Sequence, residues 1–131
     1  MSLPTLGLRH LALWIDDAVF AATVHFYRGA LAMEVQWQPD EDNVYLTSGT
    51  DNLALHRAKA PRRVVHEHSP LDHLGFCVPT AEDVTRWRER VAAHGGAIVQ
   101  EVRTHRDGAT SFYARDPAGN LLQVLHLPSL R

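Results

Sequence analysis

Residues 8–15 (LRHLALWI) and residues 71–78 (LDHLGFCV) share one pattern: a histidine in third place, a leucine in fourth place and a largely apolar remainder. The two histidines, His10 and His73, lie 63 residues apart, close to half of the 131-residue chain. Each segment precedes a polar break and then a sequence with helical spacing. Internal repetition of this kind predicts a duplicated module that carries one copy of the strand and its histidine in each half.

Both halves are expected to have the element order βαβββ. In the first half, hydrophobic periodicity predicts a helix between strands; the expected ranges are 8–15, 18–31 (the helix), 33–38, 43–47 and 53–57. In the second half, Thr80 is expected to cap the helix and Gly95 to end it; the expected strands are 71–78, 97–102, 109–115 and 121–127. We therefore expect one α+β domain with a first module at 6–58, a linker at 59–70 and a second module at 71–128.

The alternation of side chains across a strand places His10 and Trp14 on one face of the first strand. The opposite face of that strand is apolar and suits packing against a helix. His73 and Cys77 share a face in the same way. Each histidine is therefore predicted to point away from the helix of its own module. If the modules are related by a pseudo-twofold axis, the two faces would enclose a cavity with converging imidazoles.

The composition is that of a globular domain, with 45% hydrophobic and 21% charged residues and a net charge of −2. The basic residues are scattered, so we expect neither nucleic-acid nor membrane binding. A single cysteine, Cys77, excludes an intrachain disulfide, and together with an N-terminus that lacks signal-peptide features it predicts a cytoplasmic protein. Nine histidines favour metal or proton chemistry, although His66 and His68 lie in the charged linker and are interpreted as solvated.

Four segments carry a resemblance to a known family. They are 10–13 (HLAL), 26–35 (FYRGALAMEV), 73–76 (HLGF) and 111–121 (SFYARDPAGNL). With these segments the chain resembles the vicinal oxygen chelate superfamily, which includes glyoxalase I, extradiol dioxygenases, fosfomycin-resistance proteins and bleomycin-binding proteins. The resemblance covers nearly the whole chain. It implies two βαβββ modules that form an open, incomplete barrel around one divalent metal ion.

The metal ligands of the superfamily come from the first, fourth, fifth and eighth strands. By this resemblance, His10 and His73 are metal ligands, and Gln123 takes the eighth-strand position that usually holds glutamate. The fourth-strand position falls on Leu55, with His56 one residue away and expected on the opposite face.

The substitution of glutamine for glutamate has a physical consequence. Two histidines and one carboxylate suit Fe(II), Mn(II) and similar ions. Glutamine can bind through its amide oxygen but supplies no negative charge, so the affinity for the ion should fall. The expected cofactor is one ion of Fe, Mn, Ni or Zn, or none.

Four further residues are candidates for the substrate pocket. Trp14 either fills the core or stacks on an apolar or aromatic ligand, and Cys77 is either a small buried residue or part of the pocket. Tyr113 and Arg115 share one face of the predicted seventh strand. Arg115 serves either as a structural ion-pair partner or as the group that binds a substrate carboxylate.

Two functions remain open. The first is a metal-dependent enzyme, lyase-like or dioxygenase-like, in which the ion acts as a Lewis acid on a small oxygen-chelating substrate. Because no glutamate occupies the positions where glyoxalases keep their base, glyoxalase I activity is disfavoured. The second is a metal-free binding protein of the bleomycin-resistance type, which would sequester a planar ligand against Trp14. Superfamily members of this size usually dimerise, so His10 and His73 would meet either within one chain or across a homodimer interface.

Overall fold

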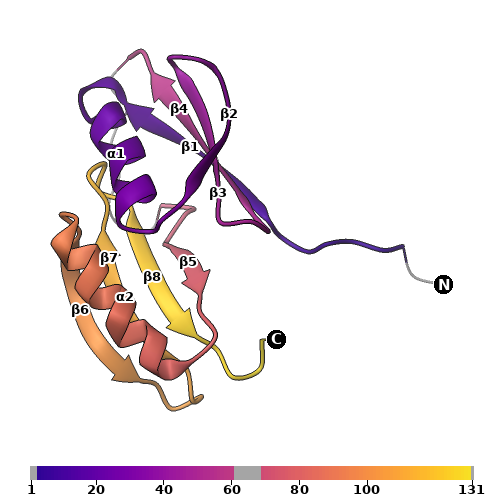
Figure 1. Cartoon of the computed structure of the whole chain (residues 1–131), viewed down its shortest axis with the longest axis vertical. Helices are drawn as coiled ribbons and strands as arrows, with labels where there is room; N and C mark the ends of the chain where they lie inside the picture. The colour runs from indigo at the N-terminus through magenta and orange to yellow at the C-terminus, as the bar shows by residue number, and fades with distance from the viewer. Residues whose placement is uncertain (1–2, 61–68, 131) are drawn as a thin grey trace.

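The computed structural model describes residues 3–60 and 69–130. The first module comprises β1 (His10–Asp16), α1 (Asp17–Gly29), β2 (Glu34–Asp40), β3 (Asn43–Thr47) and β4 (Asn52–Ala58) (Figure 1). The second comprises β5 (Leu74–Cys77), α2 (Ala81–Ala93), β6 (Ala97–Thr104), β7 (Thr110–Arg115) and β8 (Leu121–His126). The predicted order βαβββ is thus confirmed in both halves. The strand expected at 71–78 is shorter than predicted, so His73 directly precedes β5.

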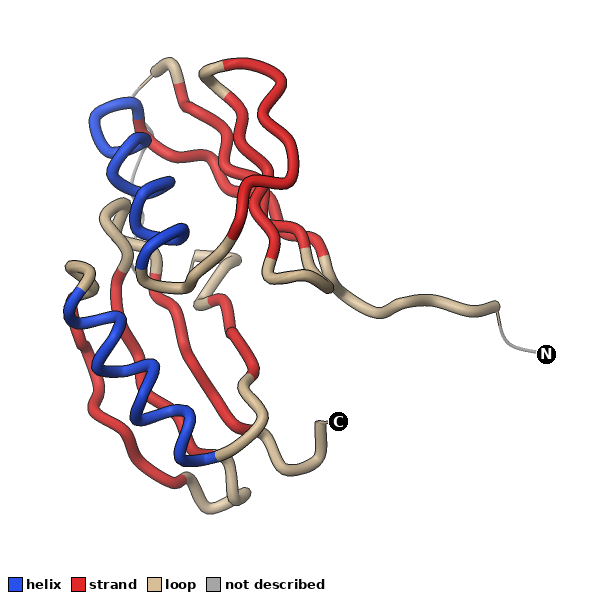
Figure 2. Tube along the Cα trace, viewed as in Figure 1, coloured by secondary structure: helices blue, strands red, loops and turns tan. Residues whose placement is uncertain are grey.

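The eight strands form two separate mixed sheets (Figure 2). Their strand orders are β1-β4-β3-β2 and β5-β8-β7-β6. In each sheet the first strand of the module pairs in parallel with the last, and the other pairs are antiparallel. Within the part of the chain that the structure describes, the sheets do not close into a barrel. The predicted α+β fold with an open, incomplete barrel is confirmed.

The duplication extends to single residues. In the first sheet one row across the strands joins Ala12, Ala54, Tyr45 and Trp37. In the second sheet the corresponding row joins Gly75, Gln123, Tyr113 and Gln100. The pairing shifts register on both sides of Trp37 and, equivalently, on both sides of Gln100. Because the irregularities recur at equivalent places, each residue of one sheet can be matched to a residue of the other.

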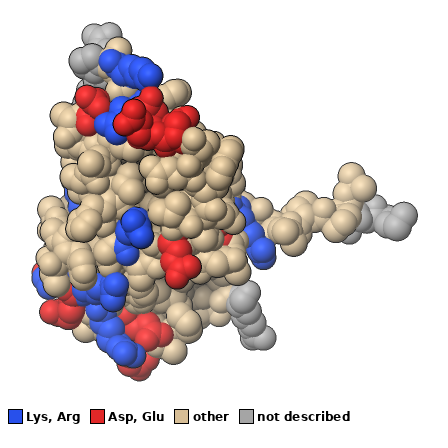
Figure 3. Space-filling view, turned by 45° about the horizontal axis from the view of Figure 1, so that its top comes forward, with Lys and Arg blue, Asp and Glu red and all other residues tan. Residues whose placement is uncertain are grey.

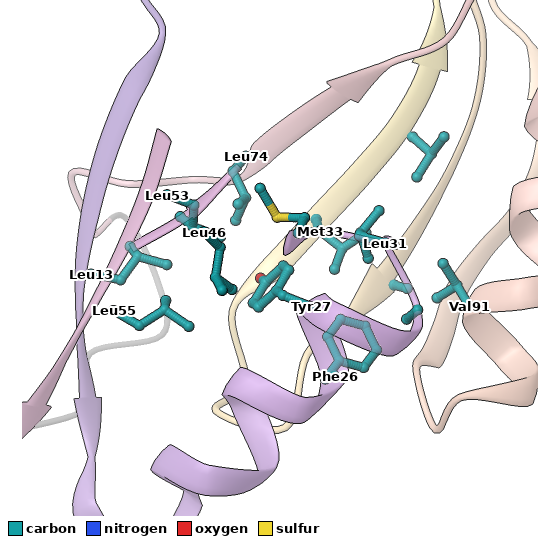
Figure 4. Packing of buried hydrophobic residues seen from close by; sticks show 14 of the residues in the cluster. Leu13, Phe26, Tyr27, Leu31, Met33, Leu46, Leu53, Leu55, Leu74 and Val91 are labelled. Atoms are coloured by element: carbon teal, nitrogen blue, oxygen red, sulfur yellow. The ribbon is translucent and has the colours of Figure 1, made fainter. Parts of the chain in front are cut away.

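The core lies on the faces of the sheets that the helices cover. Leu13 of β1 and Leu55 of β4 pair directly, and both belong to one buried cluster with Tyr27 of α1. The same cluster contains Leu74 of β5 and Val91 of α2, so both modules contribute to one core (Figure 4). Burial of each such side chain stabilises the fold by about 1.5–3 kcal/mol. The two modules therefore pack together through their helix-covered faces.

A buried hydrogen bond joins the modules. The hydroxyl of Tyr27 donates to Oδ2 of Asp116 at 2.7 Å. The other oxygen of this carboxylate accepts from the backbone amides of Ala118 and Asn120, both at 2.9 Å. Burial, together with the adjacent Asp116 carboxylate, raises the pKa of Tyr27 well above its ordinary value. The predicted Asp-Pro-Ala-Gly-Asn turn therefore also holds α1 of the first module.

Candidate functional site

We call the face of each sheet opposite its helix the outer face. His10 and Trp14 of β1 lie on the outer face of the first sheet, as their alternation predicts, and register pairs them with Asn52 and His56 of β4. His10 and Trp14 are both exposed. The first sheet thus presents an imidazole at the start of β1 and an indole four residues later.

The His10 imidazole is held by a chain of amides. Its Nδ1 lies 2.8 Å from Oδ1 of Asn52, and Nδ2 of Asn52 donates to Oε1 of Gln36 at 2.5 Å. With its amide nitrogen committed to Gln36, Asn52 offers its oxygen to a proton on Nδ1. Nε2 of His10 then keeps its lone pair free. Metal-binding histidines commonly have one ring nitrogen fixed in this way.

Aromatic rings continue along the same outer face. The ring centroids of Trp14 and His56 are 5.6 Å apart, those of His56 and Tyr45 are 5.8 Å apart, and those of Tyr45 and Trp37 are 5.0 Å apart. Oδ1 of Asn43 lies 2.6 Å from Nδ1 of His56. Trp14 and Trp37 are 62% and 58% exposed, so the run of rings is open to solvent.

The structure corrects the prediction for the fourth strand. Leu55 is fully buried on the helix-covered face, where it pairs with Leu13. His56 is paired with Trp14 and shares the outer face with His10, so the expectation that it points the other way is wrong. A one-residue error of register moves every side chain of a strand to the opposite face. At the position equivalent to Gln123, β4 carries Ala54.

The outer face of the second sheet brings together His73, Gln123 and Tyr113. Nδ1 of His73 lies 2.6 Å from Oδ1 of Asp72, and the imidazole meets the Tyr113 ring edge-on at a centroid distance of 5.3 Å. Gln123 is 9% exposed and occupies the row between Gly75 and Tyr113. A Cβ at Gly75 would lie 3.3 Å from Cδ2 of Leu125 and 3.9 Å from Oε1 of Gln123, so the amide oxygen of Gln123 lies beside Gly75.

The remaining predicted pocket residues have different surroundings. Arg115 is exposed and donates from Nη1 to the carbonyl oxygen of Gly119 at 2.9 Å, which supports the turn after β7. Cys77 is exposed on the outer face, although partial burial raises the pKa of its thiol. At neutral pH this thiol is protonated and is a weak nucleophile. Trp14 is 62% exposed, so of the two alternatives for this residue the one in which it fills the core is wrong.

The predicted ligands divide between the two sheets. His73 and Gln123 share the outer face of the second sheet, whereas His10 lies on that of the first. Among residues 3–60 and 69–130, no three His, Cys, Asp or Glu side chains lie close enough together to hold a metal ion. His66 and His68 lie outside the described residues. An imidazole with a free Nε2 and an amide oxygen nonetheless form a donor set that fits a divalent ion.

Two cavities lie away from these ligands. One, of about 680 Å³, lies beside α1 and is lined by residues that include Phe20, Arg28 and Arg57. The other, of about 260 Å³, is lined by residues that include Cys77 and Trp87. His10, His73 and Gln123 line neither of them.

Charged side chains of both signs are intermixed on the face shown in Figure 3. Arg57 bridges two acids, with Nη1 2.6 Å from Asp17 and Nε 3.0 Å from Asp42. Its guanidinium also lies 4.3 Å over the ring of Phe20. In the described residues, neither helix has the length and apolar composition that crossing a bilayer requires.

Several residues of these faces were not identified from the sequence. Tyr45, Trp37 and Asn52 have no recognisable motif. The alternation of Asn43, Tyr45 and Thr47 in β3 was the only available signal. It could show that Asn43 and Tyr45 share a face, but not that this face also carries His10.

Two βαβββ modules in open sheets, with a histidine on each outer face, define a glyoxalase-like protein. The profile of the Glyoxalase/Bleomycin resistance protein/Dioxygenase superfamily matches residues 7–124, and the chain belongs to this superfamily. This is the superfamily that the four sequence segments predict. No functionally curated protein matches the sequence.

Solved structures have the same fold. A glyoxalase-related enzyme from Fulvimarina pelagi is 18% identical with a TM-score of 0.75, and the alignment covers 92% of this chain and 88% of that one. A lactoylglutathione lyase from Agrobacterium tumefaciens is 24% identical with a TM-score of 0.71, covering 95% and 96%. An integron cassette protein from V. cholerae is 26% identical with a TM-score of 0.63, covering 96% and 97%.

Proposed function

We propose that this protein is a divalent-metal-dependent enzyme that acts on a small substrate chelating the ion through two oxygen atoms. The ligands are His10, His73 and Gln123. The observation that carries this proposal is the shared environment of the two histidines: each has Nδ1 within 2.8 Å of a side-chain oxygen, from Asn52 in one case and Asp72 in the other. Such contacts fix the ring and leave Nε2 for an ion.

A homodimer would complete the site. The modules of one chain pack through their helix-covered faces, and no other helix or strand of residues 3–60 and 69–130 covers the outer faces. In a twofold dimer, the first sheet of one subunit would face the second sheet of the other. Each site would then combine His10 with His73 and Gln123 of the partner subunit, and a symmetric dimer would contain two such sites.

The bound ion would act as a Lewis acid on the substrate oxygens. Asn52 and Asp72 keep the imidazoles in one tautomer, and Gln123 offers its amide oxygen beside Gly75. Tyr113, whose ring contacts His73, would exchange a proton with the substrate through its hydroxyl. Because Gln123 stands at the eighth-strand position that usually holds glutamate, lyase or dioxygenase chemistry is favoured over glyoxalase I chemistry.

Metal analysis tests the proposal. Untagged protein purified without chelator, and apoprotein titrated with Mn(II), Fe(II), Ni(II) or Zn(II), should bind about one ion per chain. His10→Ala and His73→Ala should each abolish binding. The exposed His25 of α1 provides a matched control, and His25→Ala should bind as the wild type does. Absence of binding by all four ions would refute the metal site.

Mixing the two variants that are expected not to bind metal tests directly whether each site is shared between two subunits. A heterodimer of His10→Ala and His73→Ala chains contains one site with both histidines and one with neither. After subunit exchange, random pairing should restore about a quarter of the wild-type metal content. If the ligands come from one chain, mixing restores nothing. Sedimentation velocity of each variant establishes that the dimer persists.

A second candidate function is supported by the exposed rings beside His10. A metal-free protein of the bleomycin-resistance type would use them to sequester a planar ligand, and the neutral Gln123 is compatible with it. The metal titration distinguishes the two functions.

A further inference from the structure

The cavity of about 680 Å³ lies on the helix side of the first sheet, between α1 and the hairpin of β2 and β3. Its apolar lining comprises Phe20, Val24, Met33 and Val44, and its volume is typical of small-molecule sites. We propose that this cavity binds a small amphipathic anion, with the apolar body on these side chains and the acidic head group at Arg28. The inference is independent of the metal site, because none of the proposed metal ligands lines the cavity.

The position of α1 leaves the cavity open. In the second module α2 packs against β6, β7 and β8 (Figure 1). In the first module α1 packs mainly against β1 and β4, which form the other half of its sheet. Val35 of β2 is 38% exposed as a result, whereas its counterpart in β6, Ile98, packs against the core.

A smaller side chain adds to the open space. In the second module Phe112 of β7 is fully buried and pairs with Val124. Val44 of β3 occupies the equivalent position, where it pairs with Leu55 and lines the cavity. Protein interiors are closely packed, so the exchange of a phenyl ring for an isopropyl group leaves space under the helix.

An ion pair spans the corresponding place in the second module. Arg88, the eighth residue of α2, donates from Nε and Nη2 to the carboxylate of Glu101 in β6, at 2.9 and 2.8 Å. The eighth residue of α1 is Val24, and the counterpart of Glu101 in β2 is Gln38. Both Val24 and Gln38 line the cavity, and they cannot form an ion pair. The first module therefore lacks both the ring that fills this space and the bridge that spans it.

The charged groups around the cavity define the head group of the ligand. At the hairpin end, Arg57 already pairs with two acids, and Glu41 adds a carboxylate. At the other end, Arg28 in the last turn of α1 has no ion-pair or hydrogen-bond partner within residues 3–60 and 69–130. A free guanidinium binds carboxylates through charge-assisted hydrogen bonds. The ligand class is therefore a carboxylic acid, or a related anion, with an apolar chain.

Calorimetry in EDTA tests the inference on the full-length protein. Octanoate should bind about tenfold more tightly than acetate, which lacks the chain, and than octylammonium, which has the opposite charge. Arg28→Ala should weaken octanoate binding about tenfold. Arg86 is an exposed arginine of α2, and Arg86→Ala is the matched control that should leave binding unchanged.

Two further variants close the cavity with the residues of the second module. Val24→Arg combined with Gln38→Glu introduces the bridging ion pair and should abolish octanoate binding. Val44→Phe introduces the buried ring and should have the same effect. Circular dichroism checks that each variant is folded. The double variant changes side chains at the rim, so it provides the test if Val44→Phe does not fold.

The outcomes separate this inference from the proposed function. Absent octanoate binding, equal affinity for the three probes, or undiminished binding after the cavity is closed would overturn the inference. If His10→Ala abolishes octanoate binding and closing the cavity does not, the anion binds on the outer face and the inference is wrong. If closing the cavity converts a dimer to a monomer without weakening octanoate, a second copy of the chain occupies the cavity and the inference is also wrong. Octanoate binding that requires Arg28 would support the cavity even if the metal analysis refutes the proposed function.

Discussion

The two sheets have the same topology and matching register, but their outer faces have diverged. His10 corresponds to His73 and Tyr45 to Tyr113, so an imidazole and a phenol are present on both. The positions that differ are Trp14 and Cys77, Trp37 and Gln100, Ala54 and Gln123, and His56 and Leu125. At these four positions the first face has three aromatic rings, and the second face has two amides.

This difference indicates where the fold constrains the sequence and where it does not. The helix-covered faces of both sheets are apolar because they share one core. The outer faces contribute little to that core and are free to specialise. The two faces, built on one repeated scaffold, therefore differ in their outer side chains while the helix-covered core stays apolar in both modules.

The largest expected effect follows from breaking the buried hydrogen bond that joins the two modules. Asp116→Ala removes the acceptor for the Tyr27 hydroxyl and for two backbone amides of the turn. Loss of a buried, fully hydrogen-bonded carboxylate should lower the free energy of unfolding by about 3 kcal/mol. Urea denaturation measures this change.

Asp107 provides the control for this change. Its exposed side chain accepts a hydrogen bond from the backbone amide of Ala109 in the turn before β7. Asp107→Ala should cost about 1 kcal/mol or less. Equal costs at the two positions would show that the contact between the modules does not stabilise the fold.

A smaller effect with a distinctive pH dependence is expected from Tyr27→Phe. Loss of a hydrogen bond to a carboxylate should cost about 2 kcal/mol at pH 7. Burial raises the pKa of Tyr27 in the folded protein above that of the unfolded chain. The stability that Tyr27 contributes is therefore fully present below about pH 10, the unfolded value, and is lost as the pH rises toward the folded value.

Urea denaturation of both proteins between pH 7 and pH 11 tests this expectation. The difference between wild type and Tyr27→Phe should be constant at neutral pH and should shrink above about pH 10. Tyr45→Phe, on the outer face, should change stability little across the range. A constant difference up to the highest pH would contradict the assigned cause.

Adding a carboxylate to the second outer face sharpens the contrast between the sheets. If Gln123 is a metal ligand, Gln123→Glu should raise the affinity for Mn(II) by about tenfold or more, because the site gains a negative charge. Gln100→Glu adds the same charge to the same row two strands away and should raise the affinity less. Calorimetric titration with Mn(II) compares the two variants. Equal gains would indicate a general electrostatic effect and no coordination by Gln123.

The sequence predicted the repeated modules well because the signal is local. The paired histidine strands, the helix cap at Thr80 and the Asp-Pro-Ala-Gly-Asn turn each depend on residues close in the chain, and Thr80 accepts the expected hydrogen bond from the amide of Asp83. The face of β4 depends on its register with β1, which is a tertiary property. For this reason Leu55 was assigned to the site while Ala54 and His56 occupy the outer face. Trp37 was missed because the register shifts around it hide the alternation of β2.

The smallest expected effect concerns Gln100, the counterpart of Trp37. Nε2 of Gln100 is buried and has no hydrogen-bond partner among the described residues. A buried polar group without a partner costs free energy, and an apolar group of similar shape removes that cost. Gln100→Leu should therefore leave the free energy of unfolding unchanged or raise it by up to about 1 kcal/mol. A loss of stability in urea would show that the amide has a partner in solution, and the second face would then be a more extensive polar network than its strand pairing indicates.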